Sequence, residues 1–298
     1  MSATADHPSV TSRELFSRIL CLTDRSAGGA EAVRQAAVLA GTGAAIDLMS
    51  IAPSRPPGTP RPQAAQIEAL VEGCELAAAR AVTCTPHIVE AEDEPTAVLE
   101  SWADHDLVVV PAGGTAAGVL SCTPGSLLIA RTPPGGSPFP ESVLVAVDGS
   151  PESHAAARLG ARLAARQHAI VTLVATPEHD SSHQHALEHD VRTVERITGK
   201  RPLILDEYRA AVPSILYAAA SVEASVIVMG RRPGHPGRSI SAEVASAEGF
   251  GLIGMRERVS LMGGTFAVAS QTGAGTTVRC SIPVPRQESR VRAAPLAS

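Results

Sequence analysis

An internal repeat constrains the fold of this chain more than any other feature of its sequence. The segment RILCLTDRS at 18–26 matches SVLVAVDGS at 142–150, so Asp24 aligns with Asp148 at a spacing of 124 residues. The same register holds without a gap to the segments SIAP and VATP, which end at Pro53 and Pro177. Each copy has an Ala-rich stretch that favours helix, followed by a short apolar run. Both copies therefore predict strand, helix, strand over about 35 residues, the size of a βαβ unit.

The rest of each copy continues the alternation of helices and strands. Runs rich in β-branched residues between helical segments are typical of parallel strands that are covered on both faces. We therefore predict an α/β fold with two doubly wound, Rossmann-like parallel sheets in tandem. Between them, the segment RTPPGGSPFP is dense in Pro and Gly and predicts a linker. The predicted domains cover residues 17–131, the first half, and 141–240, the second half.

Composition excludes several classes of function. A net charge of −5 argues against a basic nucleic-acid surface, and no apolar run is long enough for a membrane span. Five cysteines without a CxxC pair argue against a disulfide framework and a zinc cage. The single lysine, Lys200, is not in a P-loop context. The N-terminus lacks the pattern of a secretory signal, so we expect a cytoplasmic protein that binds neither membrane nor nucleic acid.

Two features in the second half are candidates for ligand binding. Asp148 follows the first strand, where ligands of open α/β sheets bind, although such a residue can equally cap the next helix. The segment GRRPGHPGRS follows the fourth strand, and its glycines permit close approach to phosphates while its arginines supply charge. A solvated surface turn is the alternative for this segment. Its three glycines are Gly230, Gly234 and Gly237.

The segments VAVDGSPES, LVATPE and VIVMGRRPG resemble the universal stress protein family, in a tandem arrangement over about 17–238. The resemblance implies a five-stranded parallel α/β domain, in which many family members bind ATP. It assigns adenosine contacts to Asp148 and Ala175 and the first phosphate-loop glycine to Gly230. The chain departs from the family's phosphate-binding motif at two places. Pro233, beside Gly234, occupies the position of the second glycine, and Glu243 lies where the final Gly-Ser pair of the motif is expected.

The first copy is further from the family pattern. Arg25 follows Asp24, and Pro111 replaces the glycine after the fourth strand. The short stretch between Pro111 and Ser126 leaves little room for a fourth helix. We therefore expect the first half to be a degenerate partner that binds no nucleotide.

Residues 249–284 resemble the end of a histidine-kinase-type ATPase domain, through a GxGLxGM box and a late GxGT. The resemblance implies that glycines of the box close a nucleotide lid, and these are Gly249, Gly251 and Gly254. The magnesium-binding Asn helix, the DxGxG segment and the acceptor-histidine helix of such kinases are not recognisable. Two interpretations stay open. Either 265–270 adds a fifth strand to the second sheet and 276–284 pairs with it, or the segment is a separate appendage.

The sequence thus predicts a non-catalytic nucleotide-binding or regulatory stress-response protein, with ATP or another adenine nucleotide as ligand and magnesium left open. A remnant of a histidine-kinase-type signalling ATPase and a ligand-free interaction scaffold are the alternatives. We expect no catalytic residue and no metal site, and regard domain pairing as the route to any oligomer. The four histidines of the segment HDSSHQHALEHD, from His179 to His189, are interpreted as a solvated helix start.

Overall fold

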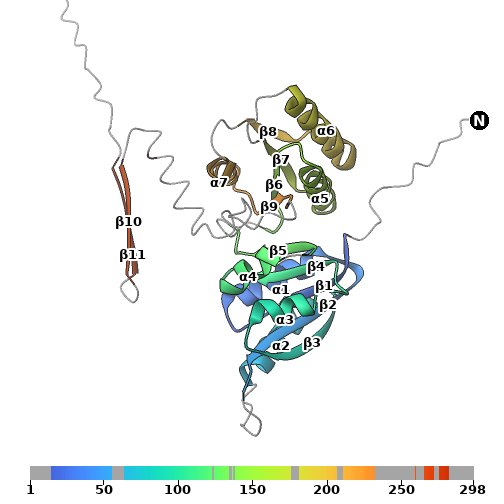
Figure 1. The fold of residues 1–298 in the computed structure, drawn as a ribbon, viewed down its shortest axis with the longest axis vertical. Coiled ribbons are helices and arrows are strands. Elements are labelled where there is room, and N and C mark those ends of the chain that lie inside the picture. Colours follow the sequence, from blue (N-terminus) through green and yellow to red (C-terminus); the bar gives the residue numbers. More distant parts are fainter. Residues whose placement is uncertain are drawn as a thin grey trace, which may run out of the picture. The chain divides into compact units, whose positions relative to one another are not determined.

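The described part of the chain forms two parallel sheets and one antiparallel hairpin (Figure 1). It divides into two units, Met1–Glu248 and Gly249–Ser298, and both parallel sheets belong to the first. The computed structural model describes residues 15–55, 64–122, 124–133, 136, 138–175, 181–206, 211–231, 259, 265–271 and 275–281. No helix within these ranges is both long and apolar enough to span a membrane.

The first half contains a five-stranded parallel sheet in the order β3-β2-β1-β4-β5. Its strands are β1 (Phe16–Leu22), β2 (Ala40–Pro53), β3 (Thr83–Ala91), β4 (Leu107–Pro111) and β5 (Ser126–Ala130). Its helices are α1 (Ala27–Leu39), α2 (Ala64–Ala78), α3 (Glu94–Glu100) and α4 (Gly114–Cys122). The stretch that was expected to leave little room for a fourth helix therefore holds α4, with nine residues.

Helices cover both faces of this sheet. Alternate residues of β1 accordingly belong to two different hydrophobic cores. Ile19 and Cys21 belong to a buried cluster that includes side chains of α1 and α2. Leu20 and Leu22 belong to a second cluster with Val98 and other side chains of α3 and α4. This alternation is what a strand with two buried faces requires.

The second half contains a four-stranded parallel sheet in the order β8-β7-β6-β9. Its strands are β6 (Ser142–Val147), β7 (Ile170–Ala175), β8 (Leu203–Asp206) and β9 (Val226–Met229). Its helices are α5 (Pro151–Gln167), α6 (Ser181–Thr198) and α7 (Ala211–Ser221). Helices α5 and α6 pack against each other, and α7 contacts β6 and β7. The two sheets confirm the predicted α/β fold class.

In the second unit, β10 (Thr265–Gln271) and β11 (Gly275–Ser281) form an antiparallel hairpin, with Val268 opposite Val278. The antiparallel pairing was predicted, and β10 pairs with β11 in a two-stranded sheet. The addition of 265–270 to the second sheet stays a prediction. The connection between β10 and β11 is short, so the entropic cost of bringing the two strands together is small. Of the segment 249–264 that precedes the hairpin, only Val259 lies within the described residues.

Candidate functional site

Three of the predicted site residues lie together at one edge of the second sheet. Asp148 directly follows β6, Ala175 ends β7, and Gly230 directly follows β9. The register pairs Val147 with Ala175 and Ala146 with Met229, so all three positions are at the carboxyl ends of adjacent strands. The chain runs from β6 to β7 and β8 on one side and to β9 on the other. The boundary between β6 and β9 is therefore the topological switch point, where open α/β sheets bind ligands.

Asp148 shapes the turn between β6 and α5. Its Oδ1 accepts hydrogen bonds from the backbone N–H of Ser150, at 3.0 Å, and from the Ser150 hydroxyl, at 2.5 Å. Ser150 is the N-cap of α5, and its Oγ accepts from the N–H of Ser153. Gly149 between them has φ +76°, which L side chains rarely adopt. The capping interpretation thus applies to Ser150, while Asp148 holds the capping hydroxyl in place.

Gly230 brings the end of β9 against the first turn of α5. A Cβ atom at this position would lie 2.4 Å from the carbonyl carbon of Glu152 and 2.7 Å from the nitrogen of Ser153. Both are backbone atoms, so no rotamer change could relieve the contact. The glycine is required by packing, whether or not a phosphate also approaches it. The close approach places the helix N-terminus, with its positive dipole end, at the candidate site.

The equivalent edge of the first half has the same turn but different surroundings. Oδ1 of Asp24 accepts from the N–H and hydroxyl of Ser26, which caps α1. Arg25 takes the place of Gly149, and its guanidinium lies 3.2 Å from the Glu68 carboxylate of α2. Pro111, the last residue of β4, takes the place of Gly230. The cap is therefore common to both halves, whereas glycine occupies these two positions only in the second.

The remaining predicted site residues lie outside the described part of the chain. This applies to the later glycines of the fourth-strand loop and to the kinase-like box, namely Gly234, Gly237, Gly249, Gly251 and Gly254. Their roles stay predictions.

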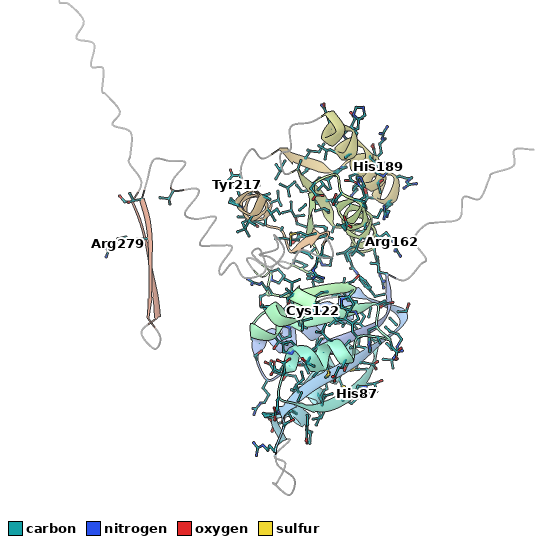
Figure 2. All side chains as sticks on the ribbon, viewed as in Figure 1. His87, Cys122, Arg162, His189, Tyr217 and Arg279 are labelled. Carbon is teal, nitrogen blue, oxygen red and sulfur yellow. The ribbon has the colours of Figure 1, made fainter. Side chains whose placement is uncertain are left out.

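A second cluster was missed by the sequence reasoning. His189 of α6, labelled in Figure 2, and the adjacent Asp190 meet His154 of α5. Nδ1 of His154 lies 2.7 Å from Oδ1 of Asp190, whose side chain is 1% exposed. Burial raises the pKa of the Asp190 carboxyl, although the hydrogen bond from His154 opposes this.

His189 is exposed and lies within α6, in agreement with the helix-start interpretation, and it also lies beside His154 and Asp190. The polar pair at 189–190 was visible in the sequence. Its partner was not, because His154 is 36 residues from Asp190 and meets it only when α5 packs on α6.

Comparison with known proteins supports the fold of both halves and a family likeness of part of the second. Residues 140–195 match the universal stress protein family, and this segment contains Asp148 and Ala175 but not Gly230. No curated protein matches the chain.

Two solved structures are similar to most of the chain. A universal stress protein from Archaeoglobus fulgidus has 14% identity and a TM-score of 0.57, with 78% of this chain and 92% of that one covered. A functionally unknown protein from Pseudomonas aeruginosa has 15% identity and a TM-score of 0.54, with 78% and 90% covered. At such identities the likeness shows the fold alone.

Proposed function

We propose that the chain is a tandem universal-stress-protein-like protein whose second half binds ATP or another adenine nucleotide in a regulatory, non-catalytic role. One observation carries the proposal. Asp148, Ala175 and Gly230, which the resemblance assigns to the nucleotide, lie side by side at the switch point of the second sheet. A carboxylate there can accept hydrogen bonds from the amine of a base or the hydroxyls of a ribose.

The second half is favoured over the first by what surrounds each aspartate. Gly149 and Gly230 present little more than backbone at the candidate edge, and backbone N–H groups are suitable donors to phosphate. In the first half, Arg25 is paired with Glu68, and the pyrrolidine ring of Pro111 has no N–H to donate. We therefore assign no nucleotide to the first half.

The kinase-type alternative has less support in the described residues. Of the segment that resembles an ATPase domain, they include mainly the hairpin of β10 and β11. Phosphoryl transfer depends on a positioned acceptor and on metal ions, and the sequence has no recognisable acceptor-histidine helix or magnesium-binding Asn helix. We accordingly propose no enzymatic activity.

Calorimetric titration of the full chain with ATP, ADP and AMP, with and without magnesium, tests the proposal. The informative variant is Asp148→Asn. The amide oxygen of Asn can still accept from Ser150 and keep the turn, but the amide nitrogen cannot accept a bond from the ligand. We expect Asp148→Asn to weaken nucleotide binding by about 1–3 kcal/mol, the range for losing a buried polar partner.

Asp24→Asn is the matched control, because Asp24 makes the same turn in the first half. It should leave the affinity unchanged. The proposal fails if no nucleotide binds saturably to the wild-type chain. Equal affinity in the wild type and Asp148→Asn would remove Asp148 from the site, and a loss confined to Asp24→Asn would move the site to the first half.

A further inference from the structure

The contact between α5 and α6 brings together three side chains of the kinds that bind transition metals. His154 comes from the first turns of α5, and His189 and Asp190 come from the middle of α6. One ligand atom from each lies within 4.8 Å of the other two. The rings of His154 and His189 are 5.1 Å apart between centroids and inclined by 66°. The two imidazoles and the carboxylate thus converge from two helices on one point.

Asp190 gives an independent reason to expect a ligand at this point. Its side chain is 1% exposed, and its Oδ1 is paired with His154. Its second oxygen, Oδ2, is buried and has no hydrogen-bond partner among the described residues. Leaving a buried acceptor unsatisfied is costly, and such groups in native proteins call for an explanation. A bound cation would provide one.

The donor set indicates which cation. Imidazole nitrogen suits Zn²⁺ and its first-row neighbours, whereas Mg²⁺ and Ca²⁺ prefer sites made of oxygen. Two histidines and one carboxylate are a known protein ligand set for zinc, with further positions left to water. His189 is exposed and His154 is 24% exposed, so solvent can reach the remaining coordination positions of the metal.

We propose that His154, His189 and Asp190 bind a divalent transition-metal ion, Zn²⁺ by preference, and thereby clamp α5 to α6. The competing explanation is a plain His–Asp pair between the helices. That pair accounts for Oδ1 of Asp190 but leaves Oδ2 unsatisfied, and it gives His189 no role. The proposal does not rest on nucleotide binding, and its test uses the metal alone.

Competition of the full chain with a chromophoric chelator for Zn²⁺, after removal of bound metal, measures the affinity. The main variant is His189→Ala, because this residue is exposed and its loss should not disturb folding. Asp190→Asn keeps the shape of the buried side chain and removes its charge. Each variant should bind Zn²⁺ at least about tenfold more weakly than the wild type. Loss of even an outer-shell partner of a metal weakens binding by about that factor.

Two controls separate this cluster from the other histidines. His168→Asn removes the histidine at the far end of α5, where φ is +58° and Asn is well tolerated. The double variant His179→Ala/His183→Ala removes two histidines of the His-rich segment that the proposed site does not include. Both should bind Zn²⁺ as the wild type does. Loss of binding in the double variant, with full binding in His189→Ala, would overturn the proposal.

Thermal unfolding gives a second readout that does not depend on the chelator. A ligand that binds only the folded state raises the melting temperature. Zn²⁺ should therefore raise Tm of the wild-type chain, have much less effect on Asp190→Asn, and not be replaceable by Mg²⁺. Absence of saturable Zn²⁺ binding to the wild type, or the same Tm increase in Asp190→Asn, would show that the cluster is only a His–Asp pair.

Discussion

The carboxylate of Asp47, within β2, lies close to basic side chains from three other parts of the first half. Its Oδ2 lies 3.2 Å from Arg18 of β1 and 2.8 Å from Nε2 of His105, and its Oδ1 lies 3.7 Å from Nε2 of His87. His87 is labelled on β3 in Figure 2. Burial by itself would raise the pKa of Asp47, but the hydrogen bonds from His105 and Arg18 and the nearby histidine charges together lower it. The folded protein therefore favours the charged form of this carboxyl.

A lowered pKa in the folded state makes stability depend on pH in a definite direction. The stabilisation is present above the ordinary aspartate range, near pH 4, and is lost as the pH falls through the lower folded pKa. We expect Asp47→Asn to lower the free energy of unfolding by about 1 kcal/mol at pH 6, since Arg18 and His87 are half exposed and solvent screens them.

Urea unfolding of the wild type and Asp47→Asn between pH 6 and pH 3 measures this effect. The difference in stability should shrink toward the acid end. Asp104→Asn, at an exposed position near His105, is the control and should have little effect on stability. A difference that stays constant down to pH 3 would contradict the pKa argument.

Among the elements, the junction of β9 with α5 is the tightest that bears on the candidate site. The backbone of Gly230 lies so close to the backbone of Glu152 and Ser153 that no Cβ atom fits between them. Since neither partner is a side chain, any larger residue at 230 must move the strand or the helix. The geometry of the candidate site therefore depends on the absence of a Cβ atom at position 230.

Gly230→Ala should accordingly destabilise the chain by about 1–3 kcal/mol, the usual cost of inserting a carbon into a well-packed site. The matched control is Gly113→Ala, which follows the fourth strand of the first half and has no atom within 4 Å of the added Cβ. Thermal or urea unfolding of both variants measures the difference. Equal stability of the two would show that β9 and α5 separate easily.

At the scale of the molecule, residues of both halves share one hydrophobic core. A single buried cluster contains Ile19 and Leu39 from the first half and Val145 and Leu163 from the second. Two side chains at the end of α5 add polar contacts to the first half. Arg166 donates to the carbonyl of Ala40 at 3.0 Å, and Gln167 donates to that of Val38 at 3.3 Å. The two halves should therefore unfold together.

The single tryptophan makes this testable, because Trp102 is buried in the first half while helices of both halves contribute to circular dichroism. Trp102 fluorescence and far-UV circular dichroism should give the same urea midpoint. The variant Arg166→Ala/Gln167→Ala should lower both midpoints. The loss of two hydrogen bonds should lower the free energy of unfolding by about 1–3 kcal/mol.

Arg192→Ala, at an exposed position on α6, is the control and should leave both midpoints nearly unchanged. Separate midpoints for the two probes in the wild type would show that the halves fold independently.

Much of the fold could be predicted because its signals are local. The repeat that aligns Asp24 with Asp148 corresponds to the same strand-turn-helix arrangement in both halves, including the capping serines Ser26 and Ser150. Apolar runs gave the parallel strands, with boundaries displaced by a few residues. Helix α6 begins at Ser181, so the His-rich segment is a helix start, as interpreted from its polarity.

By itself, the sequence determined the α/β class, the two parallel sheets and the placing of Asp148, Ala175 and Gly230 at strand ends, since periodicity and capping act over a few neighbouring residues. Only the tertiary structure decided which distant groups meet. The burial of Asp190 against His154 and the contact of Gly230 with the first turn of α5 both depend on how whole elements pack. Packing depends on the fit of many side chains at once, and no short segment of sequence encodes that fit.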